Sequence, residues 1–317
     1  MDKSNLVNNN VSVLNGESEG MNSTNLVTSN ISRTQPFSSY STKFDGIEYY
    51  TDTGGGFLNG ATTASVSVWM KMETIPASGQ YQPAISCWGT SPLNQYLIRY
   101  RTGNGFEFYL GGPVGASTSF VVARSTVTAV ANTWYNVVGT WDGSEVKIYV
   151  NGAFGGSEVA TSGSINSSTQ PNLVGRYSTT NMDGYISNTA FWTDTVLSED
   201  DILNIYNNGI TQDLNNFRVP PTNWFPLDES YTYFNGSVMV ARDVISGVDI
   251  DGVNVVQSDI VGNAPGSEAN GVGSNFVIGY LEGNMKDSKL NAYSINMADY
   301  ADGVTNPASS GRSTDTP

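Results

Sequence analysis

Histidine is absent from the 317 residues of the chain. Ser-His-Asp and Cys-His nucleophiles, histidine general bases and histidine-ligated zinc sites are therefore excluded. The acidic residues are also poorly arranged for catalysis: Glu107 is the single acid of its stretch, Lys147 follows Glu145 two residues later, and residues 199–201 open a predicted helix. Glycoside hydrolysis uses two carboxyl groups that flank the scissile bond, so the sequence predicts no enzyme.

A binding site is compatible with another set of residues. Glycans are held by an exposed aromatic platform with a few polar donors around it, and aromatic rings supply a large apolar face. The alternative for each of these aromatic residues is a place in the core, where most aromatic side chains of a β-sandwich lie. The candidates for a glycan site are Trp88, the pair Arg99 and Tyr109, and the pair Arg176 and Tyr177.

A cation site is a third kind of chemistry that the residues allow. Ca2+ binds carboxylate and carbonyl oxygens, which loops are able to supply. Asp243, Asp249 and Asp251 form the best local cluster of acidic turn residues, and we expect any bound Ca2+ there. Acidic turn residues also accept hydrogen bonds from nearby backbone in Asx turns, so a purely structural role for the same residues stays open.

The composition is that of an acidic, glycine-rich protein with a real core. A net charge of −15 and a pI near 4.2 disfavour binding to nucleic acid or to anionic lipid; solubility or a salty environment explains the acidity. Charged residues make up only 14% of the chain and glycines number 34, a composition that suits many strands joined by short turns.

The single cysteine, Cys87, lies in an apolar run and indicates a buried thiol in a protein assembled in a reducing cytoplasm. We expect neither a signal peptide nor a membrane span, because no apolar stretch is long enough.

The strands that must position the candidate residues are clearest at residues 134–152. An Asp-Gly and an Asn-Gly dipeptide mark two tight turns, because these residues tolerate positive φ angles. Between the turns, Val146, Ile148 and Val150 alternate with residues that point the other way, which is the period of a strand with one buried face. Residues 135–141 are apolar on both faces and predict a central strand.

Further strands and one helix follow from the same rules. Residues 95–101 and 106–110 alternate with period two, and a Gly-Asn-Gly turn joins them into a hairpin. Residues 198–209 predict the one clear helix, with Ser198 as its N-cap and Gly209 at its end.

Several stretches match known strands in their order along the chain. They are K-F-D-G-I-E-Y-Y at residues 43–50, A-S-V-S-V-W-M-K at 64–71, the hairpin at 134–152 and M-D-G-Y-I-S-N-T-A-F-W at 182–192. This set resembles the laminin-G-like domain of the concanavalin A-like lectin/glucanase superfamily. N-W-F-P-L-D-E at 223–229 and A-R-D-V-I-S-G at 241–247 are similar to the two strands that open this fold, although here they come last.

The resemblance implies an all-β fold, a concanavalin A-like jelly-roll sandwich of two antiparallel sheets with one short helix. We place the jelly-roll domain at residues 43–262 and expect residues 224–227 to join the sandwich that contains residues 44–50. Residues 1–42 and 263–317 are rich in Asn, Ser, Thr and Gly with few large apolar side chains. We expect them to be extended arms that order only against other chains; a floppy terminus is the alternative for residues 1–42.

The Asn-rich C-terminal segment, following such a domain, resembles those of virion proteins from tailed phages of marine bacteria. It implies a non-catalytic structural protein of the capsid-decoration or head/tail-fibre type, assembled in the host bacterial cytoplasm and displayed on the virion surface. The arms would bind other capsid or tail proteins, and the domain, as a homo-oligomer, would contact host surface glycans, with no nucleic acid and no membrane insertion. The alternatives are a bacterial carbohydrate-binding lectin or adhesin, and a glycan-active enzyme.

Overall fold

The computed structural model describes residues 36–112, 120–160 and 163–267, together with two short strands at 276–277 and 294–295. The chain divides into two units, of which the first is Pro36–Ser267. The second unit comprises Met1–Gln35 and Glu268–Pro317, and within it β20 (Phe276–Val277) pairs antiparallel with β21 (Ser294–Ile295). The expectation that the arms order against other chains concerns residues that lie mostly outside those described.

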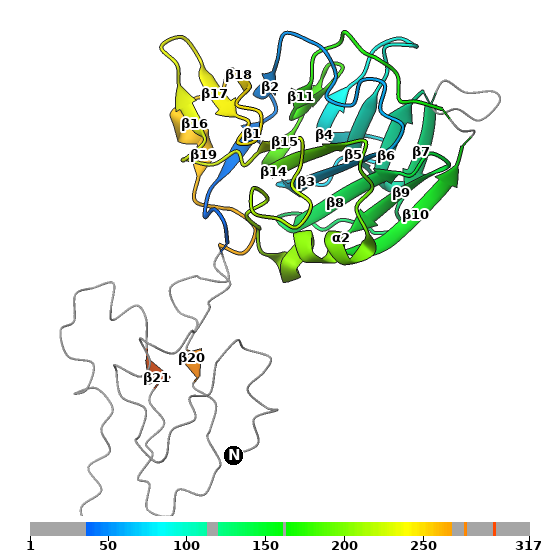
Figure 1. Ribbon diagram of the computed structural model, residues 1–317. Helices are drawn as coiled ribbons and strands as arrows, with labels where there is room; N and C mark the ends of the chain where they lie inside the picture. Colours follow the sequence, from blue (N-terminus) through cyan, green and yellow to red (C-terminus); the bar gives the residue numbers. More distant parts are fainter. Residues whose placement is uncertain (1–35, 113–119, 161–162, 268–275, 278–293, 296–317) are drawn as a thin grey trace, which may run out of the picture. The chain divides into compact units, whose positions relative to one another are not determined.

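The unit Pro36–Ser267 is a sandwich of two antiparallel sheets, which confirms the predicted fold class (Figure 1). The eight-stranded sheet has the order β10 (Ala153–Val159), β9 (Glu145–Val150), β8 (Trp134–Trp141), β3 (Ala64–Met72), β14 (Asp183–Thr193), β1 (Ser41–Asp45) and β19 (Ile260–Val261), and β15 (Asn223–Phe225) also pairs with β14. The nine-stranded sheet has the order β16 (Thr232–Phe234), β17 (Met239–Arg242), β18 (Asp249–Val253), β2 (Tyr49–Thr51), β11 (Leu173–Val174), β4 (Tyr81–Cys87), β5 (Tyr96–Arg101), β6 (Gly105–Gly111) and β7 (Phe120–Arg124). A separate short ladder joins β12 (Arg176–Tyr177) to β13 (Thr180–Asn181).

The hairpin of β8 and β9 forms as its turn residues predict. Gly143 takes a φ of 94°, and Asp142 Oδ1 accepts hydrogen bonds from the backbone N–H groups of Ser144 and Glu145. The alternation in β9 is confirmed, because its three valine and isoleucine side chains are buried in the core. These are Val146, Ile148 and Val150.

The two sheets meet in one apolar core to which both contribute large side chains, among them Phe44 and Trp141 from the eight-stranded sheet and Tyr96 and Phe108 from the nine-stranded sheet. Gly139 of β8 is required at this interface. A Cβ atom there would lie 2.3 Å from the ring of Phe108, so only glycine lets the two sheets approach this closely.

The helix α2 (Glu199–Tyr206) covers part of the outer face of the eight-stranded sheet (Figure 1). Ser198 caps it in the predicted capping box with Asp201, and Ile202 and Ile205 pack on Trp224 and its neighbours in a second, smaller core. Two short 3-10 helices, η2 (Asn207–Gly209) and η3 (Gln257–Asp259), complete the described helices. Within the described residues, no helix combines the length and apolarity that crossing a membrane requires.

The strands that come late in the sequence lie where the resemblance places them. β15 pairs with β14 in the sheet that contains β1, and Trp224 and Phe225 are fully buried. The compact unit Pro36–Ser267 includes residues just before β1, because Phe37 packs against the ring of Trp224 at a centroid distance of 4.8 Å.

Candidate functional site

The nine-stranded sheet has an outer face, turned away from the core, and strands β4 to β7 carry an unusual set of side chains on it. In β6 the core contains Phe106, Phe108 and Leu110, so Glu107 and Tyr109 lie on the opposite, outer face. The same period of two in β5 and β7 places alternate residues of those strands beside them.

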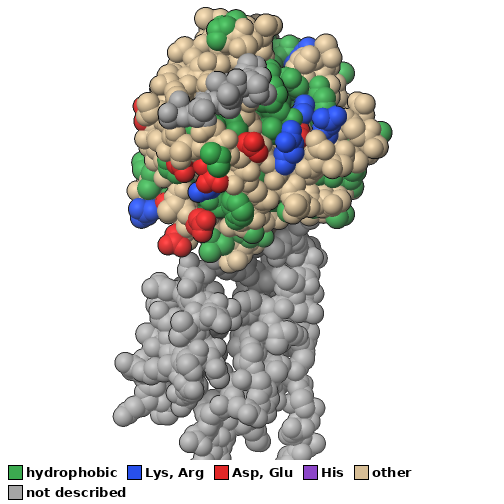
Figure 2. Space-filling model, turned by 90° about the vertical axis from the view of Figure 1, so that its right-hand side faces the viewer, with side chains coloured by type: hydrophobic (Ala, Val, Ile, Leu, Met, Phe, Trp, Pro, Cys, Tyr) green, Lys and Arg blue, Asp and Glu red, His purple; other side chains and the backbone are tan. Residues whose placement is uncertain are grey.

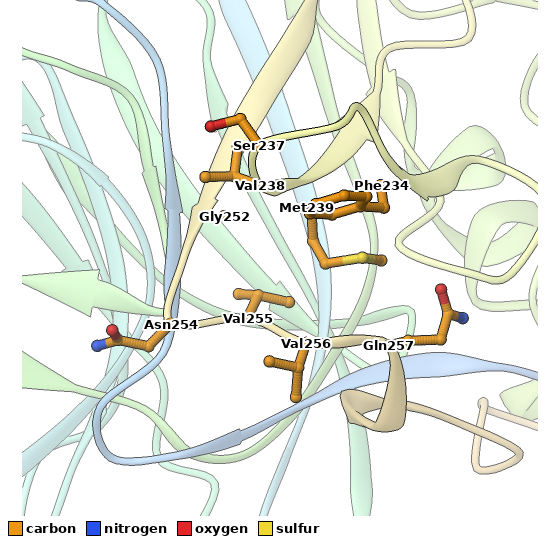
Figure 3. A pocket seen from close by; sticks show the side chains of 9 residues that line it. All are labelled: Phe234, Ser237, Val238, Met239, Gly252, Asn254, Val255, Val256 and Gln257. Atoms are coloured by element: carbon orange, nitrogen blue, oxygen red, sulfur yellow. The ribbon is translucent and has the colours of Figure 1, made fainter.

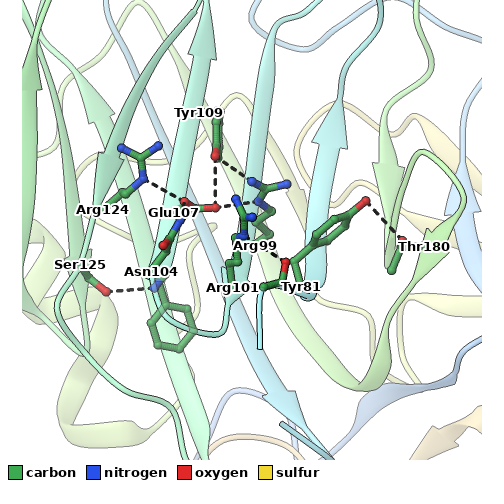
Figure 4. Close-up of polar contacts among 11 residues, drawn as sticks. Tyr81, Arg99, Arg101, Asn104, Glu107, Tyr109, Arg124, Ser125 and Thr180 are labelled. Atoms are coloured by element: carbon green, nitrogen blue, oxygen red, sulfur yellow. Dashed lines mark hydrogen bonds and ion pairs between the residues drawn. The ribbon is translucent and has the colours of Figure 1, made fainter. Parts of the chain in front are cut away.

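Glu107 stands at the centre of this face between two arginines. The strand register places Arg99 of β5 opposite Glu107 on one side and Arg124 of β7 opposite it on the other. Arg99 Nε donates to Oε2 of Glu107 at 2.8 Å, and Arg124 Nε donates to Oε1 at 2.9 Å (Figure 4). Asn104 Nδ2 also donates to Oε1 at 2.9 Å, and the Tyr109 hydroxyl donates to Oε2 at 3.2 Å.

The carboxyl group of Glu107 is held in its ionised form. Burial raises the pKa of Glu107, but hydrogen bonds from Asn104, Arg99 and Arg124 outweigh burial, and the pKa ends below its ordinary value. Two guanidinium groups therefore face one carboxylate. The Glu107 side chain has no exposed surface and that of Arg99 is 10% exposed, whereas that of Arg124 is 47% exposed. Among Arg99, Glu107 and Arg124, the side chain of Arg124 is thus the most open to solvent.

Aromatic rings surround the Arg99 end of the network. The guanidinium carbon of Arg99 lies 4.7 Å from the ring centroid of Tyr81, 4.7 Å from that of Tyr109 and 5.8 Å from that of Tyr177. Arg99 Nη2 also donates to the Tyr109 hydroxyl at 2.7 Å. Cation–π contacts of this kind hold the guanidinium plane in place.

A second group of rings lies towards β7. Trp88, which follows β4, packs edge-on against Tyr109 and Phe120, with centroid distances of 5.8 Å and 5.7 Å. Trp88 and Phe120 are half-buried. We call this surface the aromatic–arginine face, made of Tyr81, Trp88, Arg99, Glu107, Tyr109, Phe120, Arg124 and Tyr177. On the side of the domain that Figure 2 turns to the viewer, Lys and Arg side chains gather beside hydrophobic ones.

Four of the five residues proposed from the sequence as glycan contacts meet on this face: Trp88, Arg99, Tyr109 and Tyr177. Arg176 does not join them. Its guanidinium carbon lies 4.5 Å from the ring centroid of Tyr49, and its Nε donates to the Ser178 carbonyl at 2.9 Å.

Sequence reasoning missed the central role of Glu107, which it treated as isolated, and the contributions of Tyr81, Phe120 and Arg124. The alternation in F-V-V-A-R at residues 120–124 places Phe120 and Arg124 on one face, and this signal was available in the sequence. The register that brings Arg124 opposite Glu107 is a product of strand pairing.

The three aspartates proposed for Ca2+ do not fit that role. Asp243 is fully buried, and its carboxylate accepts five hydrogen bonds, which come from the backbone N–H groups of Trp224, Ile245 and Ser246, the Ser246 hydroxyl and the Asn223 amide. Asp249 is engaged by Arg242 at 3.7 Å and by the Tyr233 hydroxyl at 2.6 Å, while Asp251 is exposed. Across the part of the chain that the structure describes, no three acidic or cysteine side chains cluster closely enough to hold a metal ion.

A pocket of about 390 Å³ opens at the other end of the same sheet, between β17, β18 and η3 (Figure 3). Its walls are mainly apolar, and Phe234 and Val256 at its rim are 61% and 52% exposed. The lining residues are Phe234, Ser237, Val238, Met239, Gly252, Asn254, Val255, Val256 and Gln257. No charged side chain lines it.

Comparisons with known proteins concern the fold of the chain. A protein of Bacteroides ovatus to which carbohydrate binding has been ascribed has a similar fold, with a TM-score of 0.52 and 14% identity over 69% of this chain. The match spans 59% of that protein. A heptameric SAP-like pentraxin from Limulus polyphemus is similar at a TM-score of 0.43 and 14% identity, over 67% of this chain and 93% of the pentraxin. No curated protein matches the sequence.

The remaining comparison concerns families. Residues 45–203, half of the chain, match the model of a laminin-G family described as the Concanavalin A-like lectin/glucanases superfamily. The matched residues run from the end of β1 into α2 and include the whole aromatic–arginine face. The chain belongs to the Concanavalin A-like lectin/glucanases superfamily.

Proposed function

We propose that the aromatic–arginine face binds glycans without cleaving them. The observation that carries this proposal is that Arg124, a half-exposed guanidinium fixed at one nitrogen by Glu107, lies on the same face of the sheet as the half-buried rings of Trp88 and Phe120. Aromatic rings offer apolar faces for sugar rings, and a fixed guanidinium presents planar donors to hydroxyl or carboxylate groups. The carbohydrate binding ascribed to the Bacteroides ovatus protein supports the same ligand class.

The network is arranged for binding rather than for hydrolysis. Glu107 is the single acidic residue of β4 to β7, whereas glycosidases place two carboxyl groups about 5–9.5 Å apart. A general acid needs a raised pKa, and the pKa of Glu107 is lowered instead. The carboxylate acts here as the group that orients two arginines.

Binding of the full-length chain to a glycan array tests the proposal. Trp88→Ala removes a ring and Arg124→Ala removes the exposed donor, and each change should weaken binding to the preferred glycan about tenfold or more, the equivalent of ~1.4 kcal/mol. Phe234→Ala is the matched control, because Phe234 is an exposed aromatic residue at the pocket on the far end of the same sheet. Thermal unfolding of each variant shows whether the fold is retained.

Three outcomes oppose the proposal. Equal binding by wild type and both variants would show that the glycan site lies outside the aromatic–arginine face. Loss of binding in Phe234→Ala alone would place the glycan site in the apolar pocket. Release of new reducing ends from a bound polysaccharide would show a glycan-active enzyme.

We further propose that this domain is displayed on a virion, with the segments before Pro36 and after Ser267 attached to capsid or tail proteins and the domain present in several copies. Support comes from the Asn-rich composition of these segments and from a glycan-binding face, whose weak contacts gain strength when copies bind together. A cryo-EM map of the native particle tests this: both segments should run across neighbouring chains. If the protein is instead a bacterial lectin or adhesin, it should be found on the cell surface, and its gene should have no capsid or terminase genes beside it.

A further inference from the structure

A row of four side chains crosses the outer face of the eight-stranded sheet, away from the aromatic–arginine face. The strand register sets Lys43 of β1 opposite Tyr185 of β14, Tyr185 opposite Lys71 of β3, and Lys71 opposite Trp134 of β8. Lys71 occupies the middle of this row and is only 3% exposed. Its Nζ lies 4.6 Å from the ring centroid of Tyr185 and 5.3 Å from that of Trp134.

Asn263 reaches this lysine from the end of the compact unit. Lys71 Nζ donates to Asn263 Oδ1 at 2.5 Å, across 192 positions of the chain. Backbone contacts fix Asn263 beside the edge of the sheet: its N–H donates to the Val261 carbonyl at 2.7 Å, and its own carbonyl accepts from the Ser41 hydroxyl at 2.8 Å. The amide is therefore held against the amine by both β1 and β19.

This contact brings a nucleophile to an electrophile. A carbonyl bond is about 1.23 Å long, so Cγ of Asn263 lies within about 3.7 Å of the Lys71 nitrogen. Reacting atoms in near-attack conformers are about 3–3.5 Å apart. A primary amine that attacks an amide carbon gives a new amide and ammonia.

Two neighbouring groups are placed to move the protons. The Tyr185 hydroxyl donates to Glu73 Oε1 at 2.7 Å, and Lys43 Nζ lies 3.0 Å from the same oxygen. The hydrogen bond from Tyr185, followed by that from Lys43, lowers the pKa of Glu73, so its carboxyl group is ionised. Burial and the bond to Glu73 raise the pKa of Tyr185, while a hydrogen bond with the Asn263 side chain acts in the opposite direction. Tyr185 thus links Glu73 to the reacting amide.

We propose that Lys71 and Asn263 join spontaneously in an isopeptide bond. Glu73 takes one proton from the Lys71 ammonium through the Tyr185 hydroxyl. The neutral Nζ then bonds to Cγ of Asn263, and the C=O electron pair moves onto Oδ1. When the C=O bond re-forms, the bond from Cγ to Nδ2 breaks, and Nδ2 takes the proton that Nζ has lost and leaves as ammonia. The change is one amine and one primary amide to one secondary amide and ammonia, without an oxidant or reductant.

The bond would join the centre of the eight-stranded sheet to the C-terminal boundary of the compact unit. Lys71 is on β3, between β8 and β14, and the described unit ends at Ser267, a few residues after Asn263. A pull on the chain beyond Ser267 would then act on a covalent bond in β3 instead of peeling the two-residue strand β19 from β1. A cross-link of this kind suits a domain that is attached through its C-terminal segment.

Mass spectrometry of the full-length chain tests the proposal. The intact mass should be lower than the sequence mass by one ammonia, and proteolysis should yield one branched peptide in which Lys71 is joined to Asn263. Succinimide formation at an Asn-Gly turn also releases ammonia, so the branched peptide is the deciding observation. Lys71 and Asn263 found only in separate linear peptides, after prolonged incubation of the folded protein, would overturn the proposal.

Matched variants separate the chemistry from the fold. Lys71→Arg keeps the positive charge and the cation–π contacts but cannot form the amide, so the branched peptide should vanish. Asn263→Asp should still react, with loss of one water instead of one ammonia. Glu73→Gln should slow formation about tenfold or more, since general-base catalysis contributes factors of about 10²–10⁴. Branched peptide formed at an unchanged rate in Glu73→Gln would remove Glu73 from the reaction.

Discussion

Glu107 of β6 and Arg124 of β7 are direct cross-strand partners, and Arg124 Nε donates to Glu107 Oε1 at 2.9 Å although one side chain is fully buried and the other is nearly half exposed. The pair therefore links the interior of the network to the surface. A buried carboxylate fixes the arginine, and the exposed part of the guanidinium remains available to a ligand. In the proposed glycan site, an acid that is the single acidic residue of its strand would thus serve to orient an arginine.

Removing the charge of Glu107 should destabilise the domain. Glu107→Gln leaves Arg99 and Arg124 without their shared anion, and loss of one partner of a buried ion pair costs about 3 kcal/mol. Urea unfolding followed by tryptophan fluorescence measures the change. The control is Glu145→Gln in β9, a partly exposed acid whose loss should change the free energy of unfolding by less than about 0.5 kcal/mol. Equal stability of both variants would show that the charge of Glu107 does not stabilise the fold through Arg99 and Arg124.

The stability of the domain should fall in acid, partly through the same residue. The pKa of Glu107 is lower in the folded state than in the unfolded chain, so its contribution is fully present above the unfolded value of about 4.3 and is lost as the pH falls through the folded value. The free energy of unfolding of wild type should therefore decline below about pH 4.3 more steeply than that of Glu107→Gln. Parallel curves would contradict the lowered pKa. Glu73, Asp142 and Asp201 also have lowered pKa values and account for the decline that both proteins share.

Adding one methyl group between the sheets should also be costly. Gly139→Ala places a Cβ against the Phe108 ring, and overpacking of a dense core costs about 1–3 kcal/mol. Phe108→Leu, combined with Gly139→Ala, should recover part of that loss, because the smaller side chain leaves room. A double-mutant cycle of thermal unfolding measures the coupling. Additive effects would show that the two residues do not contact.

The late strands should be necessary for folding. A chain that ends at Pro220 lacks β15 and the fully buried side chains of Trp224, Phe225 and Leu227. Deleting each large core side chain costs about 2–5 kcal/mol, and a domain has about 5–15 kcal/mol in total. We expect no cooperative thermal transition in this truncated chain. Truncation after Ser267 is the control and should retain the transition; an unchanged melting temperature for the shorter chain would contradict the role of β15.

The fold could be inferred from local patterns because they report burial directly. The alternation of Val146, Ile148 and Val150 specifies which face of β9 meets the core, and the Asp-Gly turn specifies the hairpin. The late W-F-P-L-D-E stretch is assigned to the sandwich through its resemblance to a strand that opens this fold, and its late position is allowed because pairing, not chain order, sets the place of a strand.

The contacts that carry chemistry depend on which strands become neighbours. Glu107 and Arg124 are separated by 17 positions, and Lys71 and Asn263 by 192, and no periodicity in the sequence relates either pair. Trp88 and Tyr109 are similar: each is a plausible core residue until pairing and twist place it outside the core. For Asp243 the sequence pattern was misleading. Its carboxylate accepts five hydrogen bonds in the structure, but the sequence of the turn does not distinguish such a carboxylate from one that is free to bind a cation. Burial patterns depend on neighbouring residues and can therefore be recognised in the sequence. The register of strands across two sheets depends on the packing of the whole domain, so it cannot.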